Sequence, residues 1–231
     1  MLILEGVRIL QGGFSLSADW AVAAGGRVAL IGPSGAGKST LLLAIAGFVP
    51  LAAGQISWAG QDLAARTPGE RPLSLLFQDQ NLFPHLTIAQ NLGLGLNPSL
   101  KLNAAQQNQI ESAIDRVGLA GLGARKPASL SGGQQGRAAL ARALLRARPM
   151  LLLDEPFAAL GPALKAEMLD LVAEVAGDTG ATVLMVTHDP SDAKRFADET
   201  VFVADGIAHA PVATAKLFEK PPPALSAYLG R

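Results

Sequence analysis

Hydrophobic residues along this chain form short runs whose pattern changes from one region to the next. Residues 14–22, FSLSADWAV, alternate apolar and polar side chains, which is typical of a half-buried strand. Residues 150–155 (MLLLDE) and 182–187 (TVLMVT) are continuous apolar runs, as in parallel strands that are covered on both faces. Residues 26–31 (GRVALI) form a similar short run that ends at a glycine.

Helical patterns occupy the segments between these runs. STLLLAIAG, which follows the first of them, has the length of a helix, and Gly47 is placed to end it. The pattern is helical from about 81 to 148, with breaks at 97–98 and 118–123, and again near 162–176. QISW and PLSLLF predict further strands, and VFVADGIAHA carries the Asp-Gly signal of a hairpin. This order predicts a parallel α/β core interrupted by a helical subdomain.

Composition narrows the class of protein. Among 231 residues, 19 Lys and Arg balance 19 Asp and Glu, so no basic excess favours nucleic-acid binding. The chain has no cysteine, which removes thiolate metal sites and disulfides and suits a reducing cytosol. Only 16% of residues are charged and 49% are hydrophobic, which indicates either an apolar surface to cover or an alanine-rich core. MLILEGVRIL predicts no signal peptide, and no apolar stretch is long enough to span a membrane.

A phosphate-binding loop follows the run at 26–31. GPSGAGKST fits the pattern GxxxxGK followed by Ser or Thr, with a strand before it and a helix after it. Its glycines let backbone N–H groups surround phosphate oxygens, Lys38 reaches the β- and γ-phosphates, and the Ser39 hydroxyl ligates Mg²⁺. A plain glycine turn explains the glycines but not Lys and Ser together at a helix start. The nucleotide-binding residues are therefore predicted to be Gly32, Pro33, Ser34, Gly35, Ala36, Gly37, Lys38, Ser39 and Thr40.

Three further segments end where ligands of open α/β sheets gather. Asp154 and Glu155 follow a buried strand; the first can hold Mg²⁺ and the second can take a proton from an attacking water. His188 follows the next such strand and precedes DPSDA, a helix start that Ser191 or Asp192 is expected to cap. Gln78 comes directly after PLSLLF and is either a solvated strand end or a contact to Mg²⁺ and water. His188 is correspondingly either a loop residue or a γ-phosphate sensor.

A second glycine-rich loop, LSGGQ, comprises Leu130, Ser131, Gly132, Gly133 and Gln134. Its S-x-x-Q spacing is that of a capping box opening a helix over 131–148. Capping leaves the glycines unexplained, because each costs about 1 kcal/mol against Ala in a helix. Close approach of the backbone to another group, with an anion favoured at a helix start, is the alternative.

These motifs in this order resemble the nucleotide-binding subunit of an ABC transporter, over essentially the whole chain. The resemblance implies an ABC-type P-loop NTPase: one α/β domain over 1–231, with a mostly parallel core sheet (about 1–79 and 150–231), an antiparallel N-terminal β part and an inserted helical subdomain (about 80–149). It implies ATP and Mg²⁺ as cofactors, with Glu155, His188 and Gln78 catalytic and Ser39, Gln78 and Asp154 around the metal.

The same resemblance implies partners. In that family two subunits pack head to tail, and the LSGGQ loop of one closes over the ATP that the other holds. Spacing alone leaves a contact within one chain open. A membrane-spanning permease, and indirectly a solute-binding protein outside the membrane, complete such importers. The chain is then expected as a peripheral protein at the cytoplasmic face of the inner membrane, with no nucleic acid bound.

Residues 72–107 resemble, in more detail, the ATP-binding subunits of bacterial thiamine importers. Leu82, Phe83, Pro84 and His85 are then expected to meet the permease, although Phe83 packed inside the helical subdomain is the alternative. The sequence also departs from the family. Gln11 stands where an aromatic residue usually stacks on adenine, Ala158–Ala159–Leu160–Gly161 lacks the usual aspartate, and Gly136 replaces a glutamine. Looser coupling between two sites is expected from these changes.

The sequence supports one principal hypothesis and two alternatives. The principal one is an ATPase that powers import of a small solute, thiamine by resemblance, through a separate membrane subunit. The first alternative is a soluble ABC ATPase of nucleic-acid repair or translation, which the single cassette and zero net charge oppose. The second is a degenerate ATP-binding scaffold, which the complete set of catalytic residues opposes.

Overall fold

The structure is a computed structural model of the 231-residue chain, and it describes residues 1–77 and 82–230. The strands are β1 (Leu2–Gln11), β2 (Phe14–Val22), β3 (Arg27–Ile31), β4 (Ala53–Trp58), β5 (Gln61–Asp62), β6 (Leu73–Leu76), β7 (Met150–Asp154), β8 (Thr182–Val186), β9 (Glu199–Ala204), β10 (Ile207–Ala208) and β11 (Val212–Ala213). The helices are α1 (Lys38–Ala46), α2 (Ile88–Leu96), α3 (Ala104–Arg116), α4 (Gly132–Leu145), α5 (Pro162–Thr179), α6 (Pro190–Phe196), α7 (Thr214–Glu219) and α8 (Pro223–Tyr228).

The strands described pair in the order β5-β4-β1-β2-β10-β9-β3-β8-β7-β6, with β11 beside β9. Strands β9, β3, β8, β7 and β6 run parallel. Strand β1 pairs antiparallel with β2 and β4, and these N-terminal strands lie together toward the β5 end of the sheet. The predicted parallel core and antiparallel N-terminal β part are therefore confirmed.

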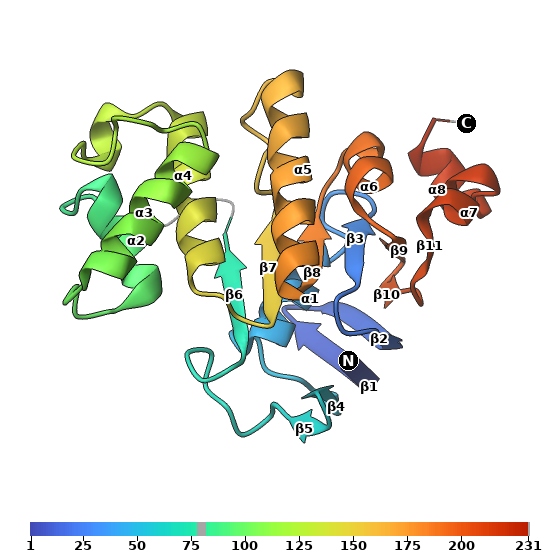
Figure 1. The fold of residues 1–231 in the computed structure, drawn as a ribbon. Coiled ribbons are helices and arrows are strands. Elements are labelled where there is room, and N and C mark those ends of the chain that lie inside the picture. Colours follow the sequence, from blue (N-terminus) through green and yellow to red (C-terminus); the bar gives the residue numbers. More distant parts are fainter. Residues whose placement is uncertain (78–81, 231) are drawn as a thin grey trace.

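Both faces of the parallel strands are buried, as their continuous apolar sequences predict. Alternate residues of β7 serve opposite cores: Leu151 and Leu153 pack on one face, and Met150 and Leu152 on the other. Helix α5 packs in the core that contains Leu151 and Leu153. Helix α1 packs in the core that contains Met150 and Leu152, between the parallel strands and the N-terminal strands. Figure 1 shows α5 on one side of β7 and β8, with α1 behind them.

Helices α2, α3 and α4 pack on one another beside β6, at one end of the sheet. In Figure 1 they form a separate group of green and yellow helices at the left, while α7 and α8 lie at the right of the view. Each of α2, α3 and α4 begins with a capping box, made by Thr87, Asn103 and Ser131 with the glutamine three residues later. Local sequence therefore sets the start of all three helices.

The structure extends or corrects several expectations. The hairpin between β9 and β10 is confirmed, with Asp205 and Gly206 both at positive φ (50° and 73°) as a tight two-residue turn requires. Helix α4 spans Gly132–Leu145, which is shorter than the predicted 131–148. Strand β1 was not predicted, because a register shift between Leu4 and Val7 interrupts its alternation of buried and exposed residues.

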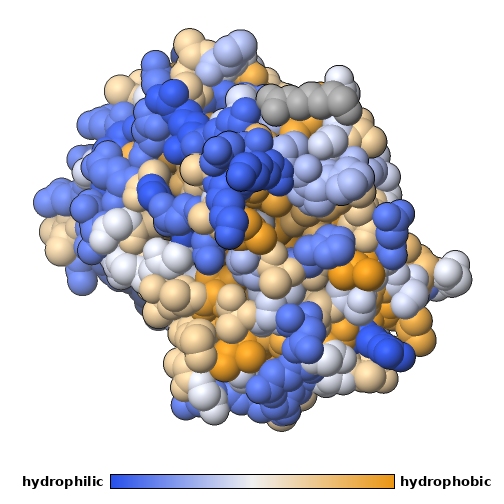
Figure 2. Space-filling model, turned by 90° about the vertical axis from the view of Figure 1, so that its right-hand side faces the viewer, coloured by the Kyte–Doolittle hydropathy of each residue, from blue (hydrophilic) through white to orange (hydrophobic). Residues whose placement is uncertain are grey.

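Most of the apolar composition goes into the core. On the face that Figure 2 presents, hydrophobic side chains are interspersed with hydrophilic ones, which gather at its upper left. Phe48 and Phe83 are large apolar side chains that remain 55% and 46% exposed. In the part of the chain that the structure describes, no helix combines the length and the hydropathy that crossing a membrane requires.

Candidate active site

A cavity of about 880 Å³ lies at the carboxyl ends of β3, β7 and β8. Four parts of the chain line it: the β1–β2 turn with Gln11 and Phe14, the loop and helix start within 32–40, the residues Glu155 and His188, and Tyr228 of α8. This is the edge where parallel strands point their carboxyl ends, and where α/β proteins bind ligands. Its size suits a ligand the size of a nucleotide.

The loop at 32–37 needs glycine at two positions for reasons of space. Gly32 has φ +151°, and a Cβ there would lie 2.0 Å from the backbone oxygen of Val203 in β9. Gly37 has φ +97°, and a Cβ there would lie 2.4 Å from the ring of Phe14. Gly35 is different, because its φ is +77° but an added Cβ there would meet no atom within 4 Å in the part of the chain that the structure describes. Packing therefore fixes both ends of the loop and leaves its middle open.

Lys38, the first residue of α1, is buried, and its ammonium donates to the backbone oxygens of Gly32 and Pro33, each at 2.8 Å. Burial lowers the pKa of Lys38, while the charges of Glu155 and Asp154 oppose that change. The ammonium is thus folded back onto its own loop, beside two carboxylates. A phosphate that enters the loop can replace the two carbonyl oxygens as its partner.

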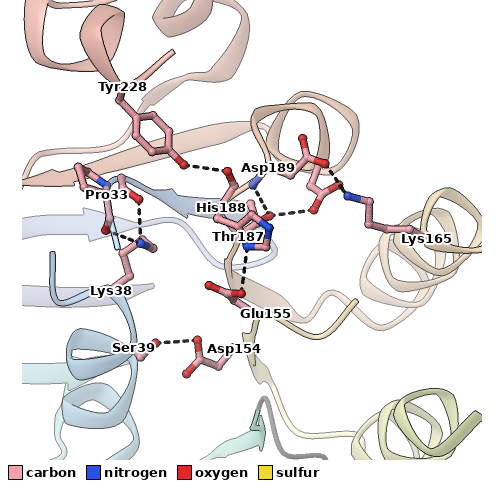
Figure 3. Close-up of polar contacts among 12 residues, drawn as sticks. Pro33, Lys38, Ser39, Asp154, Glu155, Lys165, Thr187, His188, Asp189 and Tyr228 are labelled. Atoms are coloured by element: carbon pink, nitrogen blue, oxygen red, sulfur yellow. Dashed lines mark hydrogen bonds and ion pairs between the residues drawn. The ribbon is translucent and has the colours of Figure 1, made fainter. Parts of the chain in front are cut away.

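Ser39 and Asp154 come together although 115 positions separate them. The Ser39 hydroxyl donates to Asp154 Oδ1 at 2.9 Å (Figure 3). Burial foremost raises the pKa of Asp154, and the nearby Glu155 adds to that effect. A hydroxyl and a carboxylate are hard oxygen donors of the kind that Mg²⁺ prefers, with phosphate and water completing its shell. A buried carboxylate also gains from a cation that compensates its charge, so this pair fits Mg²⁺.

Glu155 and His188 face each other at the same edge. His188 Nδ1 lies 3.0 Å from Glu155 Oε2 (Figure 3). Glu155 has φ +46°, a left-handed conformation that is unusual for a residue with a side chain, and its N–H donates to the oxygen of Val186 in β8. Such backbone conformations cluster at functional sites. The side chains of Glu155 and His188 are 23% and 63% exposed, so water reaches both.

The residues on either side of His188 are held by charged and polar contacts. Lys165 of α5 forms ion pairs with Asp189 at 2.5 Å and with Asp192 at 2.8 Å. The Thr187 hydroxyl donates to Asp192 Oδ2 at 2.8 Å. Asp189, and not the predicted Ser191 or Asp192, caps α6, because its side chain accepts from the N–H of Ser191 two residues later.

The loop 130–134 lies outside this cavity, because no residue of that loop is among the described residues that line it. Ser131 accepts from the N–H of Gln134 and the Gln134 side chain accepts in return from the N–H of Ser131, so the predicted capping box is present. An added Cβ at Gly133 would lie 2.8 Å from Leu160 Cδ2, whereas one at Gly132 would meet no atom of the described residues within 4 Å. The contact at Gly133 is with the movable end of a half-buried side chain, so packing within the molecule constrains this glycine only weakly.

The remaining predicted residues fall in different places. Ser34 and Thr40 line the cavity, and Ala36 packs against the core under the N-terminal strands. Leu130 is buried. Gln78 lies outside the described residues. Phe14 and Tyr228 also line the cavity, which the sequence does not reveal: the pattern at Phe14 indicates only a strand, and nothing in the short C-terminal segment marks its tyrosine.

The fold and this cavity define a class: a P-loop nucleotide-binding ATPase with an additional helical group. The model of the ABC transporter family matches residues 17–158, more than half of the chain. The chain therefore belongs to the ABC transporter family, and it is an ATP-hydrolysing, ABC-type ATPase.

Curated relatives match over the whole chain. A protein of Cereibacter sphaeroides named "Thiamine import ATP-binding protein ThiQ" is 68% identical over 230 residues and covers 100% of both chains. A protein of the same name from Ruegeria sp. is 60% identical with the same coverage, and one from Shigella flexneri is 56% identical over 79% of this chain and 78% of its own. A solved dimeric, post-hydrolysis structure of the ATP-binding cassette MJ0796, bound to ADP and Pi, has a TM-score of 0.83 at 27% identity and covers 93% of this chain and 99% of its own.

Proposed function

We propose that this chain is the ATP-hydrolysing subunit of an importer for thiamine and that it acts with a separate membrane permease. The observation that carries the proposal is the match, over both full lengths, to relatives named for thiamine import. The alternative of an ABC ATPase of nucleic-acid repair or translation is not favoured, because these relatives are named for thiamine import and not for either of those processes. As proposed from the sequence, one domain comprises the core (about 1–79 and 150–231) and a helical subdomain (about 80–149).

The proposed mechanism assigns one role to each group of the cavity. The N–H groups of the loop at 32–37 and the start of α1 hold the phosphates. Lys38 exchanges its bonds with the oxygens of Gly32 and Pro33 for bonds with the β- and γ-phosphates. Glu155 takes the proton of the attacking water, and His188, 3.0 Å away, senses the γ-phosphate.

Ser39 and Asp154 are the residues that would hold Mg²⁺, with Gln78 as the further contact that we propose from sequence. When bound, the ion neutralises charge that develops on the β- and γ-phosphate oxygens. The hydrogen bond between Ser39 and Asp154 already places their oxygens 2.9 Å apart. The protein therefore needs little rearrangement of these two side chains to bind the ion.

We propose a head-to-tail dimer in which the loop 130–134 of each chain serves the ATP of its partner. Three observations support this arrangement. Residues 130–134 are missing from the described lining of their own chain's cavity, and no atom of the described residues fills the space beside Gly132 at the start of α4. The related cassette MJ0796 has been solved as a dimer. Gly161 leaves α5 without a side-chain cap where the family has aspartate, which agrees with looser coupling between the two sites.

The permease is proposed to dock on Leu82, Phe83, Pro84 and His85. Phe83 is 46% exposed, which favours this interpretation over burial within the helical subdomain. Its ring lies 5.8 Å from the guanidinium carbon of Arg142 and forms an edge contact with His85. A solute-binding protein would meet the permease and not this chain. This assembly places the chain at the cytoplasmic face of the inner membrane.

Uptake of labelled thiamine by cells that lack this protein tests the proposal. We expect uptake to be lost, to return with the wild-type gene and to stay lost with Glu155→Gln. Removing a general base lowers the rate by about 10²–10⁴-fold, so the purified Glu155→Gln protein should bind ATP without measurable turnover. Glu167→Gln, an exposed glutamate of α5, is the matched control and should restore uptake. Normal thiamine uptake in the deletion strain, with loss of another solute, would refute thiamine as the substrate.

A further inference from the structure

We propose that Tyr228 is a positioning residue for His188 and that the C-terminal helix α8 thereby forms part of the ATP site. This inference rests on the proposed role of His188 in hydrolysis. Tyr228 is the only tyrosine of the chain. It lies 40 positions beyond the histidine in sequence, and it reaches the same cavity as the phosphate-binding loop.

Packing holds Tyr228 in place from within α8. Leu225, one turn earlier, is fully buried in the core that α5 shares, and Tyr228 and Leu229 pack against the same core. The Tyr228 ring lies 6.3 Å from that of Phe202 in β9, tilted by 49°. Aromatic pairs at this distance stabilise one another. The ring is therefore fixed by contacts that do not involve its hydroxyl.

The hydroxyl of Tyr228 makes a separate contact with the segment that carries His188. It donates to the backbone oxygen of His188 at 2.8 Å (Figure 3). Burial foremost raises the pKa of Tyr228, and the negative charges of Glu155 and Asp189 act in the same direction. The phenol therefore keeps its proton at neutral pH, which it needs in order to donate. The hydroxyl therefore binds the backbone of His188, while the ring packs against the core.

Tyr228 completes a set of contacts that holds the loop from opposite sides. On the α5 side, Lys165 pairs with Asp189. On the α8 side, Tyr228 binds the carbonyl of His188 (Figure 3). With Asp189 and the carbonyl group of His188 both anchored, the imidazole has little freedom except rotation about its own side-chain bonds, and it faces Glu155 at 3.0 Å. Loss of the hydroxyl frees the peptide and so lowers the population of imidazoles in the reactive geometry.

Tyr228→Phe separates the two contacts, because it removes the hydroxyl and keeps the ring. A hydrogen bond of this kind corresponds to about a three- to tenfold change in an equilibrium or a rate. We therefore expect kcat for ATP hydrolysis to fall by about three- to tenfold, while KM for ATP stays within about twofold because the phosphate loop is untouched. The thermal unfolding midpoint should change little. Ser226→Ala is the control, since it removes another hydroxyl of α8, one that donates to Pro221, and it should leave kcat unchanged.

The double variant with His188→Ala tests whether Tyr228 acts through the histidine. If it does, Tyr228→Phe causes no further loss in the His188→Ala background, because no imidazole remains to be positioned. An equal fold loss in both backgrounds, or a wild-type kcat for Tyr228→Phe, overturns the proposal. If His188→Ala itself hydrolyses ATP at the wild-type rate, the proposed role of His188 in hydrolysis is refuted. The proposal that Tyr228 positions His188 is then refuted as well. Loss in His188→Ala but not in Tyr228→Phe would refute the positioning role alone.

Discussion

At the scale of single residues, the surroundings of each side chain decide which of two interpretations holds. Gly32 is required because the backbone of Val203 occupies the space that a Cβ would need, and Gly37 because its φ of +97° is a conformation that residues with a side chain rarely adopt. At Gly133 an added Cβ would meet only the end of the Leu160 side chain, and at Gly132 it would meet no atom of the residues that the structure describes. The surroundings of Asp189 likewise show its role. It caps α6 and forms an ion pair with Lys165, so its charge stabilises the fold.

Asp189→Asn should reduce stability in a way that depends on pH. The pKa of Asp189 is lowered from 3.8 to about 2, and the hydrogen bond from Lys165 is the largest cause. Because the folded pKa lies below the unfolded one, this stabilisation is fully present above about pH 4 and is lost as pH falls toward 2. The variant should therefore unfold more easily than the wild type near neutral pH, and the difference should shrink on acidification.

Urea unfolding at several pH values measures this difference. Asparagine can still accept at the start of α6, so the comparison isolates the charge. Asp205→Asn, in the exposed turn between β9 and β10, is the control, because Asn takes the left-handed conformation there as readily as Asp. A difference for Asp189→Asn that stays constant down to the acid range would contradict the assignment.

At the scale of elements, strong local patterns predicted the structure and weak ones did not. The buried runs gave β3, β7 and β8, and a capping box gave the start of α4. Strand β1 was missed because a bulge breaks its period, and β5 and β11 because two residues carry no period at all. Tyr228 could not be predicted, because its role depends on tertiary packing of Leu225 and Phe202.

Helix α4 allows the capping and functional interpretations of Ser131 to be separated. Ser131 and Asn103 make the same capping box at the starts of α4 and α3, and both are exposed. Replacement of such a cap by Ala costs about 0.5–2 kcal/mol of stability. We expect Ser131→Ala and Asn103→Ala to lose similar free energies of unfolding, but only Ser131→Ala to lose ATP hydrolysis. Equal activity of the two variants would leave capping as the sole role of Ser131.

At the scale of the whole molecule, the two glycine-rich loops lie in different parts of the fold. One is at the carboxyl edge of the parallel strands, and the other opens α4 in the group of helices beside β6 (Figure 1). Lys38, Ser39, Asp154 and Glu155 all come from the first part. A complete site made by two chains would therefore take its catalytic carboxylates and its phosphate loop from one chain, and residues 130–134 from the other.

Mixing two inactive variants tests this division directly. In a head-to-tail pair of Lys38→Ala with Ser131→Ala, one of the two sites receives an intact Lys38 from one chain and an intact Ser131 from the other. Random pairing makes half of the dimers mixed, so we expect about a quarter of the wild-type ATPase rate to return when each site works independently. Lys38→Ala mixed with Glu155→Gln is the control: both residues belong to the same half of a site, so no pairing restores it. A mixture of the first two variants that stays as inactive as either one alone would mean that the loop at 130–134 does not serve the partner's nucleotide.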